Sequence, residues 1–267
     1  MANTSYPKGM QKLLETLINL SSATIKVALV SDGYTYSAAH EFVADLGATR
    51  VGTDQTLTSV SVAGGVIDAD DPDFGALPPG NTVKAFVVYR ETGNTATAPL
   101  LFYFDTALGL PFATNGGTLT IPWDNGVKKI ARVYLPFYPK GAEKLLQAGV
   151  NFGTDTLKVV ALPNGYVYNV AHEFLDDLGT LIGTPVTLTG KSVTNGVFDA
   201  DDADLGALAG GSTIGSLVIF RDSGDPTTSP VLLRPTDITG FPLATSGSNV
   251  AIRWSNGSAK IFSLVPA

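Results

Sequence analysis

Residues 24–47 read TIKVALVSDGYTYSAAHEFVADLG, and residues 156–179 read TLKVVALPNGYVYNVAHEFLDDLG, so the second stretch repeats the first 132 residues later (156 − 24). The repeat extends outward on both sides. Segment 6–47 matches 138–179 at 21 of 42 positions, and segment 56–130 matches 187–261, at an offset of 131, at 34 of 75. A period of this length indicates the tandem duplication of a whole domain rather than a solenoid of short repeats.

The duplication predicts two β-rich copies, residues 1–135 and residues 136–267, with the boundary near Pro136. Each copy is long enough to bury a hydrophobic core of its own. The chain of 267 residues has only two histidines and two tryptophans. Each pair occupies equivalent positions in the two copies: His40 with His172, and Trp123 with Trp254.

Short runs rich in β-branched and aromatic residues, separated by Gly, Pro and Asn, predict strands at 24–30, 82–89, 100–104 and 118–123. The sequence Trp123-Asp-Asn-Gly126, repeated as Trp254-Ser-Asn-Gly257, predicts a hairpin because Asn-Gly accepts the positive φ angles of a tight turn. The expected fold is mainly β: two tandem antiparallel β-sandwich or barrel-like domains, each with one or two short helices.

Two helices are expected in the first copy, at 8–20 and at 38–46. The first carries an apolar stripe that includes Leu13 and Leu17, which are the candidate contact residues of this element. The stripe has to be covered by its own sandwich, which is the favoured reading, or by a neighbouring protein. Gly149 stands at the position of Leu17 in the second copy, so a docking role would belong mainly to the first.

Composition excludes several classes of function. The chain has no cysteine, which excludes disulfide frameworks, thiolate nucleophiles and cysteine-based zinc sites. Its formal net charge of −7 disfavours nucleic acid and anionic membranes as partners. No apolar run approaches the roughly 20 residues of a membrane span, and the first residues lack the layout of a signal peptide. We therefore expect synthesis in a cytoplasm, with no nucleic-acid or membrane partner.

Catalytic motifs are weak. His40-Glu41 and His172-Glu173 are the histidine–carboxylate pairs, but no HExxH pattern follows, and adjacent residues point in different directions. Packing or helix capping is the favoured reading of these pairs. No nucleotide-binding glycine pattern or GxSxG motif occurs. We expect a protein that is not an enzyme, with no catalytic residues and no cofactor.

Two acidic runs offer oxygen ligands that could suit Ca²⁺, although they lack the glycine and the final glutamate of an EF-hand. The alternative, a turn held by aspartate–backbone hydrogen bonds, is favoured. The candidate residues are Asp68, Asp70, Asp71 and Asp73, repeated as Asp199, Asp201, Asp202 and Asp204.

Aromatic residues recur at equivalent positions and could form a platform on which a sugar stacks. Packing in a core or an interface is the commoner use of such side chains. The candidates for this interaction are Tyr34, Tyr36 and Trp123 in the first copy and Tyr166, Tyr168 and Trp254 in the second.

The motifs together resemble a family of small virion proteins of tailed bacteriophages. The resemblance is carried by YPKG with KLL three residues later, by GYxYxxAHEF with DLG following, by DADD, and by GLPFATNGG and WDNG in the first copy. It covers residues 6–130 and 138–261. The second copy departs from the pattern at Arg234-Pro235 and at Ser246-Gly-Ser248.

The resemblance implies a virion structural protein, one that decorates or cements the head shell by binding across major capsid protein subunits. A tail- or fibre-associated protein with a carbohydrate-binding module is the alternative. Two fused copies could bridge sites on a quasi-symmetric lattice, and three chains would give a pseudo-six-fold ring of modules, so a homotrimer is expected. The expected location is the virion, after synthesis in the host cytoplasm.

Overall fold

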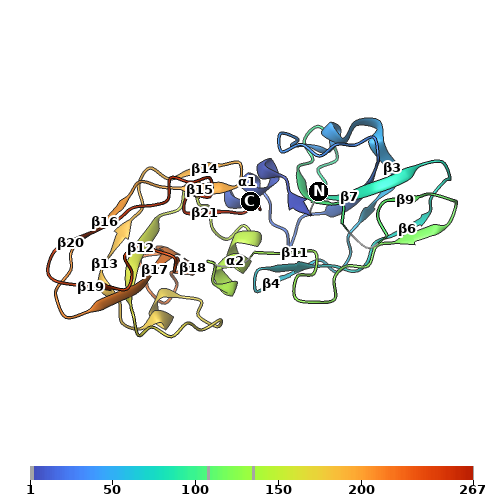
Figure 1. The fold of residues 1–267 in the computed structure, drawn as a ribbon. Helices are drawn as coiled ribbons and strands as arrows, with labels where there is room; N and C mark the ends of the chain where they lie inside the picture. The colour runs from blue at the N-terminus through green and yellow to red at the C-terminus, as the bar shows by residue number, and fades with distance from the viewer. Residues whose placement is uncertain (1–2, 107–108, 134–135, 267) are drawn as a thin grey trace.

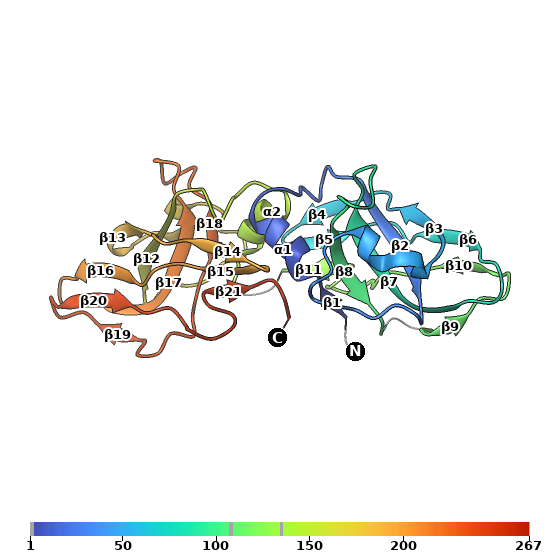
Figure 2. The same cartoon turned by 90° about the horizontal axis from the view of Figure 1, so that it is seen from above.

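The computed structural model describes residues 3–106, 109–133 and 136–266. The chain is mainly β, with two groups of sheets that fit two β-sandwich domains, one formed by each copy. The two lie at opposite ends of an elongated molecule, and two short helices, α1 and α2, lie between them (Figures 1 and 2). The expected fold class is confirmed. The expected boundary at Pro136 directly follows residues 134–135, which lie outside the described residues.

The first copy comprises β1 Thr4–Ser5, α1 Pro7–Leu14, β2 Ile25–Ser31, the 3-10 helix η1 Val43–Thr49, β3 Arg50–Thr56, β4 Ser61–Ala63, β5 Val66–Asp68, β6 Asp73–Ala76, β7 Thr82–Arg90, β8 Leu100–Phe104, β9 Phe112–Ala113, β10 Thr118–Thr120 and β11 Ala131–Arg132. The second comprises α2 Pro139–Leu146, β12 Leu157–Pro163, the 3-10 helix η2 Leu175–Leu178, β13 Ile182–Thr187, β14 Ser192–Thr194, β15 Val197–Asp199, β16 Ala203–Ala207, β17 Thr213–Arg221, β18 Val231–Leu233, β19 Leu243–Ala244, β20 Asn249–Ile252 and β21 Phe262–Ser263.

A central antiparallel sheet organises each copy. In the first its order is β1-β8-β7-β2-β3, with β9 on β7, and in the second it is β13-β12-β17-β18, with β19 on β17. Successive side chains of a strand point to opposite faces of the sheet. Both faces of each central sheet are buried, each against its own core cluster. Val27 and Val88 point into the main core of the first copy, whereas Ala28 and Val87 belong to a smaller cluster on the opposite face. The second copy repeats this division.

The strands predicted at 24–30, 82–89 and 100–104 are confirmed as β2, β7 and β8, and the one predicted at 118–123 is shorter, as β10. The predicted Asn-Gly hairpins are wrong. The strands flanking Asn125-Gly126 pair with β6 and β5 instead of each other, and those flanking Asn256-Gly257 pair with β16 and β15. The turn is held locally, since the Gly126 amide donates to Asp124 Oδ1 at 2.9 Å.

The helix predicted at 8–20 ends at Leu14. Thr16 adopts a left-handed conformation with φ of 59°. The amide of Thr16 donates to the Leu13 carbonyl (3.2 Å) and that of Leu17 to the Lys12 carbonyl (2.9 Å). These two bonds form a Schellman cap, which ends the helix. Ala148, with φ of 54°, repeats the cap at the end of α2.

The helix predicted at 38–46 is also wrong over its first half. Helical structure starts only at Val43, in the 3-10 helix η1. Phe42 is extended, with φ of −122° and ψ of 161°. The Asp45 carboxylate holds this arrangement by accepting the amides of Glu41 at 2.7 Å and Phe42 at 2.9 Å.

Candidate functional site: the seam between the two copies

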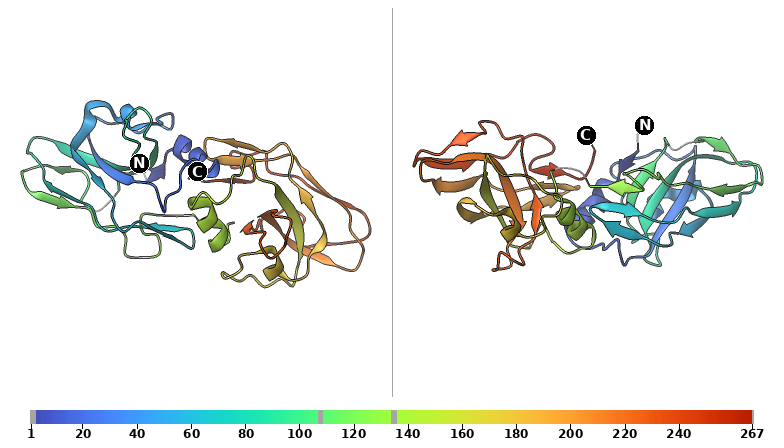
Figure 3. Two further views of the ribbon diagram at one scale, coloured as in Figure 1. Left: turned by 180° about the vertical axis from the view of Figure 1, so that it is seen from behind. Right: turned by 90° about the horizontal axis from the view of Figure 1, so that it is seen from below.

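The contact between the copies, here called the seam, is built by α1, α2 and two tight hairpins. The α1 helix contacts β14 of the second copy, α2 contacts β4 of the first, and the helices contact each other. Figure 3 shows from two further sides that both helices lie between the sheet groups. Both helices begin at the repeated Tyr-Pro-Lys-Gly motif, in which the proline occupies the first turn.

Equivalent residues make equivalent contacts across the seam. The Leu20 amide donates to the Leu146 carbonyl and the Phe152 amide donates to the Leu14 carbonyl, both at 2.9 Å. Leu14 and Leu20 are the counterparts of Leu146 and Phe152. A contact in which i meets j and j meets i is isologous and relates its two halves by a two-fold axis. The seam therefore has approximate two-fold symmetry.

The hairpin tips obey the same symmetry. The amide of Gly64 donates to Glu143 Oε2 at 2.9 Å, and that of its counterpart Asn195 donates to Gln11 Oε1 at 3.0 Å. Gln11 and Glu143 are also counterparts. Each tip is a two-residue turn with two positive φ angles, 56° and 78° at Gly64-Gly65 and 51° and 78° at Asn195-Gly196. This is the type I′ geometry that closes hairpins.

The second residue of each tip is a glycine, Gly65 or Gly196, and it touches the helix of the other copy. A Cβ added at Gly65 would lie 2.5 Å from the Cβ of Ala142, and one added at Gly196 would lie 2.6 Å from the Cβ of Met10. The absence of a side chain thus allows the backbone to approach the helix. The sequence did not predict this contact between a hairpin and a helix, although Asn195-Gly196 between two strand-like runs is itself a hairpin signal.

The cores of the two copies also meet at the seam. Leu14 belongs to the main core cluster of the second copy, and Leu146 belongs to that of the first. Both side chains are almost completely buried. Each helix therefore contributes one leucine to the core of the other copy.

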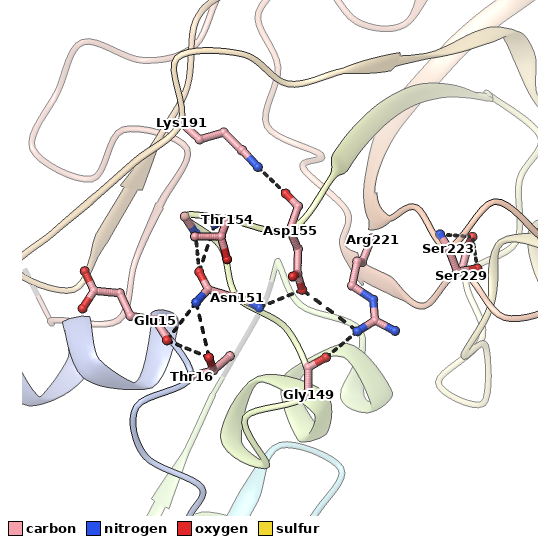
Figure 4. A network of polar contacts seen from close by, with 11 residues as sticks. Glu15, Thr16, Gly149, Asn151, Thr154, Asp155, Lys191, Arg221, Ser223 and Ser229 are labelled. Atoms are coloured by element: carbon pink, nitrogen blue, oxygen red, sulfur yellow. Dashed lines mark hydrogen bonds and ion pairs between the residues drawn. The ribbon is translucent and has the colours of Figure 1, made fainter.

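One polar network strengthens the seam on the side of the second copy (Figure 4). Asn151 Nδ2 donates to the Glu15 carbonyl at 2.8 Å and to Thr16 Oγ1 at 3.3 Å. The Asn151 amide in turn donates to Asp155 Oδ2 at 2.9 Å. Lys191 Nζ donates to the Asp155 carbonyl, and burial lowers the pKa of this lysine. The end of α1 is thereby fixed to the second copy.

The candidate contact residues Leu13 and Leu17 do not share a surface. Leu13 is buried in the first copy's core, where Leu146 also packs, whereas Leu17 lies beyond the helix cap and is 56% exposed. The single stripe expected from helical periodicity is wrong because the helix ends between them. Covering of the α1 stripe by its own core is confirmed for Leu13.

The aromatic candidates lie on different sides of the central sheets. Tyr34 is buried in the small cluster of the first copy, where Tyr36 is half-buried against it, whereas Trp123 packs on Phe86 and Phe104 in the main core. In the second copy Tyr166 and Tyr168 are half-buried at the small cluster, and Trp254 lies against the main core. The structure does not bring these six side chains together on one platform.

The tyrosines form a hydrogen-bonded chain with the histidines in both copies. The Tyr34 hydroxyl lies 2.8 Å from the Tyr6 hydroxyl and 2.8 Å from His40 Nδ1. Tyr138, Tyr166 and His172 repeat the chain at 2.8 and 2.7 Å. Burial raises the pKa of Tyr34 to about 12, and the hydrogen bond with Tyr6 opposes that shift.

The histidines and the adjacent glutamates have separate partners. Glu41 pairs with Lys12 at 2.6 Å and Glu173 with Lys144 at 3.1 Å, while the histidines contact tyrosine. Asp177 accepts two backbone amides next to His172, and these bonds lower the pKa of its carboxyl. These contacts hold the loop that precedes η1 in the first copy and η2 in the second.

The acidic runs serve turns and neighbouring strands. Asp70 Oδ2 accepts the hydroxyls of Thr58 and Ser59, and these bonds lower the pKa of its carboxyl. Asp71 and Asp202 accept the amides of Trp123 and Trp254. The remaining aspartates of the two acidic runs also have partners within their own copy. Ion pairs join Asp68 to Lys129 and Asp199 to Lys260. Hydrogen bonds join Asp201 to Thr189, Asp73 to Gly75 and Asp204 to Gly206. Within the described ranges, no three carboxylate or histidine side chains gather where they could hold a metal ion.

Comparison of the chain with protein-family models, with curated proteins and with solved structures gives no match. Among the described residues, no helix has the length and apolar character needed to cross a bilayer.

Proposed function

We propose that the chain is a non-enzymatic structural protein of a bacteriophage virion that decorates the head and binds across major capsid protein subunits. The sequence motifs support this assignment through the resemblance described above. The structural observation that carries it is the seam, because it holds two related but non-identical β-sandwiches in one unit. Such a unit can bind two neighbouring subunits at once, and linked contacts gain effective concentration.

The seam constrains the assembly. Modules in a pseudo-six-fold ring are related by rotations of 60°, whereas reciprocal contacts relate the two copies of this chain by a two-fold axis. A homotrimer remains our proposal, but its six modules would be arranged in three two-fold pairs around the three-fold axis. Capsid contacts would then be made by the outer faces of the sandwiches.

The decisive experiment measures the copy number and the position of the protein in purified particles. Quantitative mass spectrometry against the major shell protein should give a ratio of about one-third or more, and one trimer at every local three-fold position would bring that ratio to about one. Electron microscopy should place the density on the head surface. A few dozen copies on the tail would replace the head assignment by the tail or fibre alternative, and absence from the particle would refute both.

A further inference from the structure

A polar groove of about 830 Å³ opens on the first copy, on the side of the central sheet that carries the small tyrosine cluster. Its walls are β2, β3 and β7, η1 and the loop that follows β7. The polar residues that line it include Lys26, Arg50, Asp54, Tyr89, Glu91 and Asn94. The volume lies within the usual range for small-molecule sites.

Asp54 is the centre of a triad inside this groove. The Tyr89 hydroxyl and Arg50 Nη1 each lie 2.8 Å from Asp54 Oδ2, and both donate to it. The Asp54 side chain is 10% exposed, and that of Arg50 is 38% exposed. Both bonds use the same oxygen, so the other carboxylate oxygen receives neither of them. Lys26 and Glu91 form a second ion pair beside the triad, at 2.9 Å.

The second copy lacks the whole triad. Leu181, Pro185 and Phe220 stand where the first copy has Arg50, Asp54 and Tyr89. The Lys26–Glu91 pair, in contrast, is retained as Lys158–Asp222 at 2.7 Å.

The same fold therefore forms with three apolar residues at these positions. A shielded ion pair is weak evidence of stabilisation, because desolvation offsets the attraction between the charges. Folding therefore does not require these three polar groups. Their presence together in one groove of one copy indicates that they bind a ligand.

The charges indicate the class of ligand. Two cations, Lys26 and Arg50, are balanced by two carboxylates, Asp54 and Glu91, so the groove favours neither a strong anion nor a cation. The groove contains donors on Lys26 and Arg50 and acceptors on Asp54 and Glu91, and a ligand hydroxyl group can satisfy both because it donates and accepts. Hydrogen bonds to the charged groups would be the strongest contacts.

We propose that this groove binds a neutral carbohydrate, with Asp54 and Arg50 contacting its hydroxyl groups and Tyr89 acting as a positioning residue for Asp54. The inference does not depend on where the protein sits in a particle. The groove is a different site from the aromatic platform that the sequence suggested for a sugar, because none of the six platform residues lines it.

The test is a titration of the full-length, isotope-labelled chain followed by amide NMR. The probes are D-glucose, D-galactose, D-mannose, L-rhamnose, N-acetyl-D-glucosamine, maltose, lactose and cellobiose. At least one should shift the amides of residues 50–56 and 93–98, with no response at 181–187 of the second copy. No response to any probe, or an equal response in both copies, would overturn the proposal.

Variants separate binding from folding. Asp54→Asn should weaken binding of the responding sugar by about tenfold or more, since a charge-assisted contact is lost. Tyr89→Phe should weaken binding, measured at a temperature where the variant stays folded, because Asp54 loses the hydroxyl that positions it. Asp222→Asn is the matched control and should leave affinity unchanged. Unchanged affinity in Asp54→Asn would also overturn the assignment.

Discussion

Single residues distinguish the two copies most clearly around the tyrosine cluster. Arg234 stands where the first copy has Tyr103, and its guanidinium lies over the rings of Tyr166 and Tyr168 at 5.3 and 5.6 Å. Its Nε also donates to Ser216 Oγ at 3.1 Å. The position of Ser216 is occupied by alanine in the first copy. The buried Tyr103 hydroxyl accordingly has no hydrogen-bond partner among the residues described.

Replacing Tyr103 by phenylalanine should therefore raise the free energy of unfolding, by about 1 kcal/mol, because an unsatisfied buried hydroxyl is removed. Tyr34→Phe is the control and should lower it, since the Tyr34 hydroxyl has two partners. Urea unfolding at neutral pH measures both. A loss of stability in Tyr103→Phe would contradict this prediction.

Alkaline pH gives a second measurement on the same residue. Burial raises the pKa of Tyr103 to about 12, above the value of about 10 in an unfolded chain. A group with a raised folded-state pKa contributes stability that is complete below the unfolded pKa and is lost as the pH rises through the folded pKa. Tyr103→Phe should accordingly lose less stability than the parent between about pH 10 and 12, which unfolding at stepped pH would show.

At the scale of elements, local sequence predicted the strands well and the connections poorly. β2, β7 and β8 follow from dense runs of β-branched and aromatic residues, which tertiary packing reinforces. The length of α1 did not follow, because a Schellman cap at Thr16 overrides an apolar periodicity that continues to Leu20. The seam was not predictable either, because periodicity within one copy says nothing about how copies meet.

The hairpin tips give the sharpest prediction at this scale. Gly196→Ala should destabilise the chain for two reasons: a positive φ of 78°, which costs about 1–2 kcal/mol for an L-residue, and the collision with Met10 across the seam. Gly206→Ala is the matched control, since its φ is 74° but an added Cβ meets nothing within 4 Å. Urea unfolding should show a loss for Gly196→Ala larger by about 1–3 kcal/mol. Equal losses would show that the seam tolerates the methyl group.

For the whole molecule, the exchange of leucines couples the stability of the two copies. Leu14 lies in the first copy but packs in the core cluster of the second, among residues such as Phe152 and Leu232. Truncation of a buried leucine to alanine typically costs about 2–5 kcal/mol. The loss should therefore be felt in strands that are far from position 14 along the chain.

Leu14→Ala should accelerate amide hydrogen exchange in β12 and β17 of the second copy, and Leu146→Ala should do the same in β2 and β7 of the first, because each variant leaves a cavity in the opposite core. Leu17→Ala is the control, since that side chain is 56% exposed and should leave exchange in both copies unchanged. Mass spectrometry of peptides from the full-length chain resolves the two copies, whose sequences differ. Faster exchange confined to the copy that carries each substitution would contradict the coupling, and the seam would then be a contact between two independently stable sandwiches.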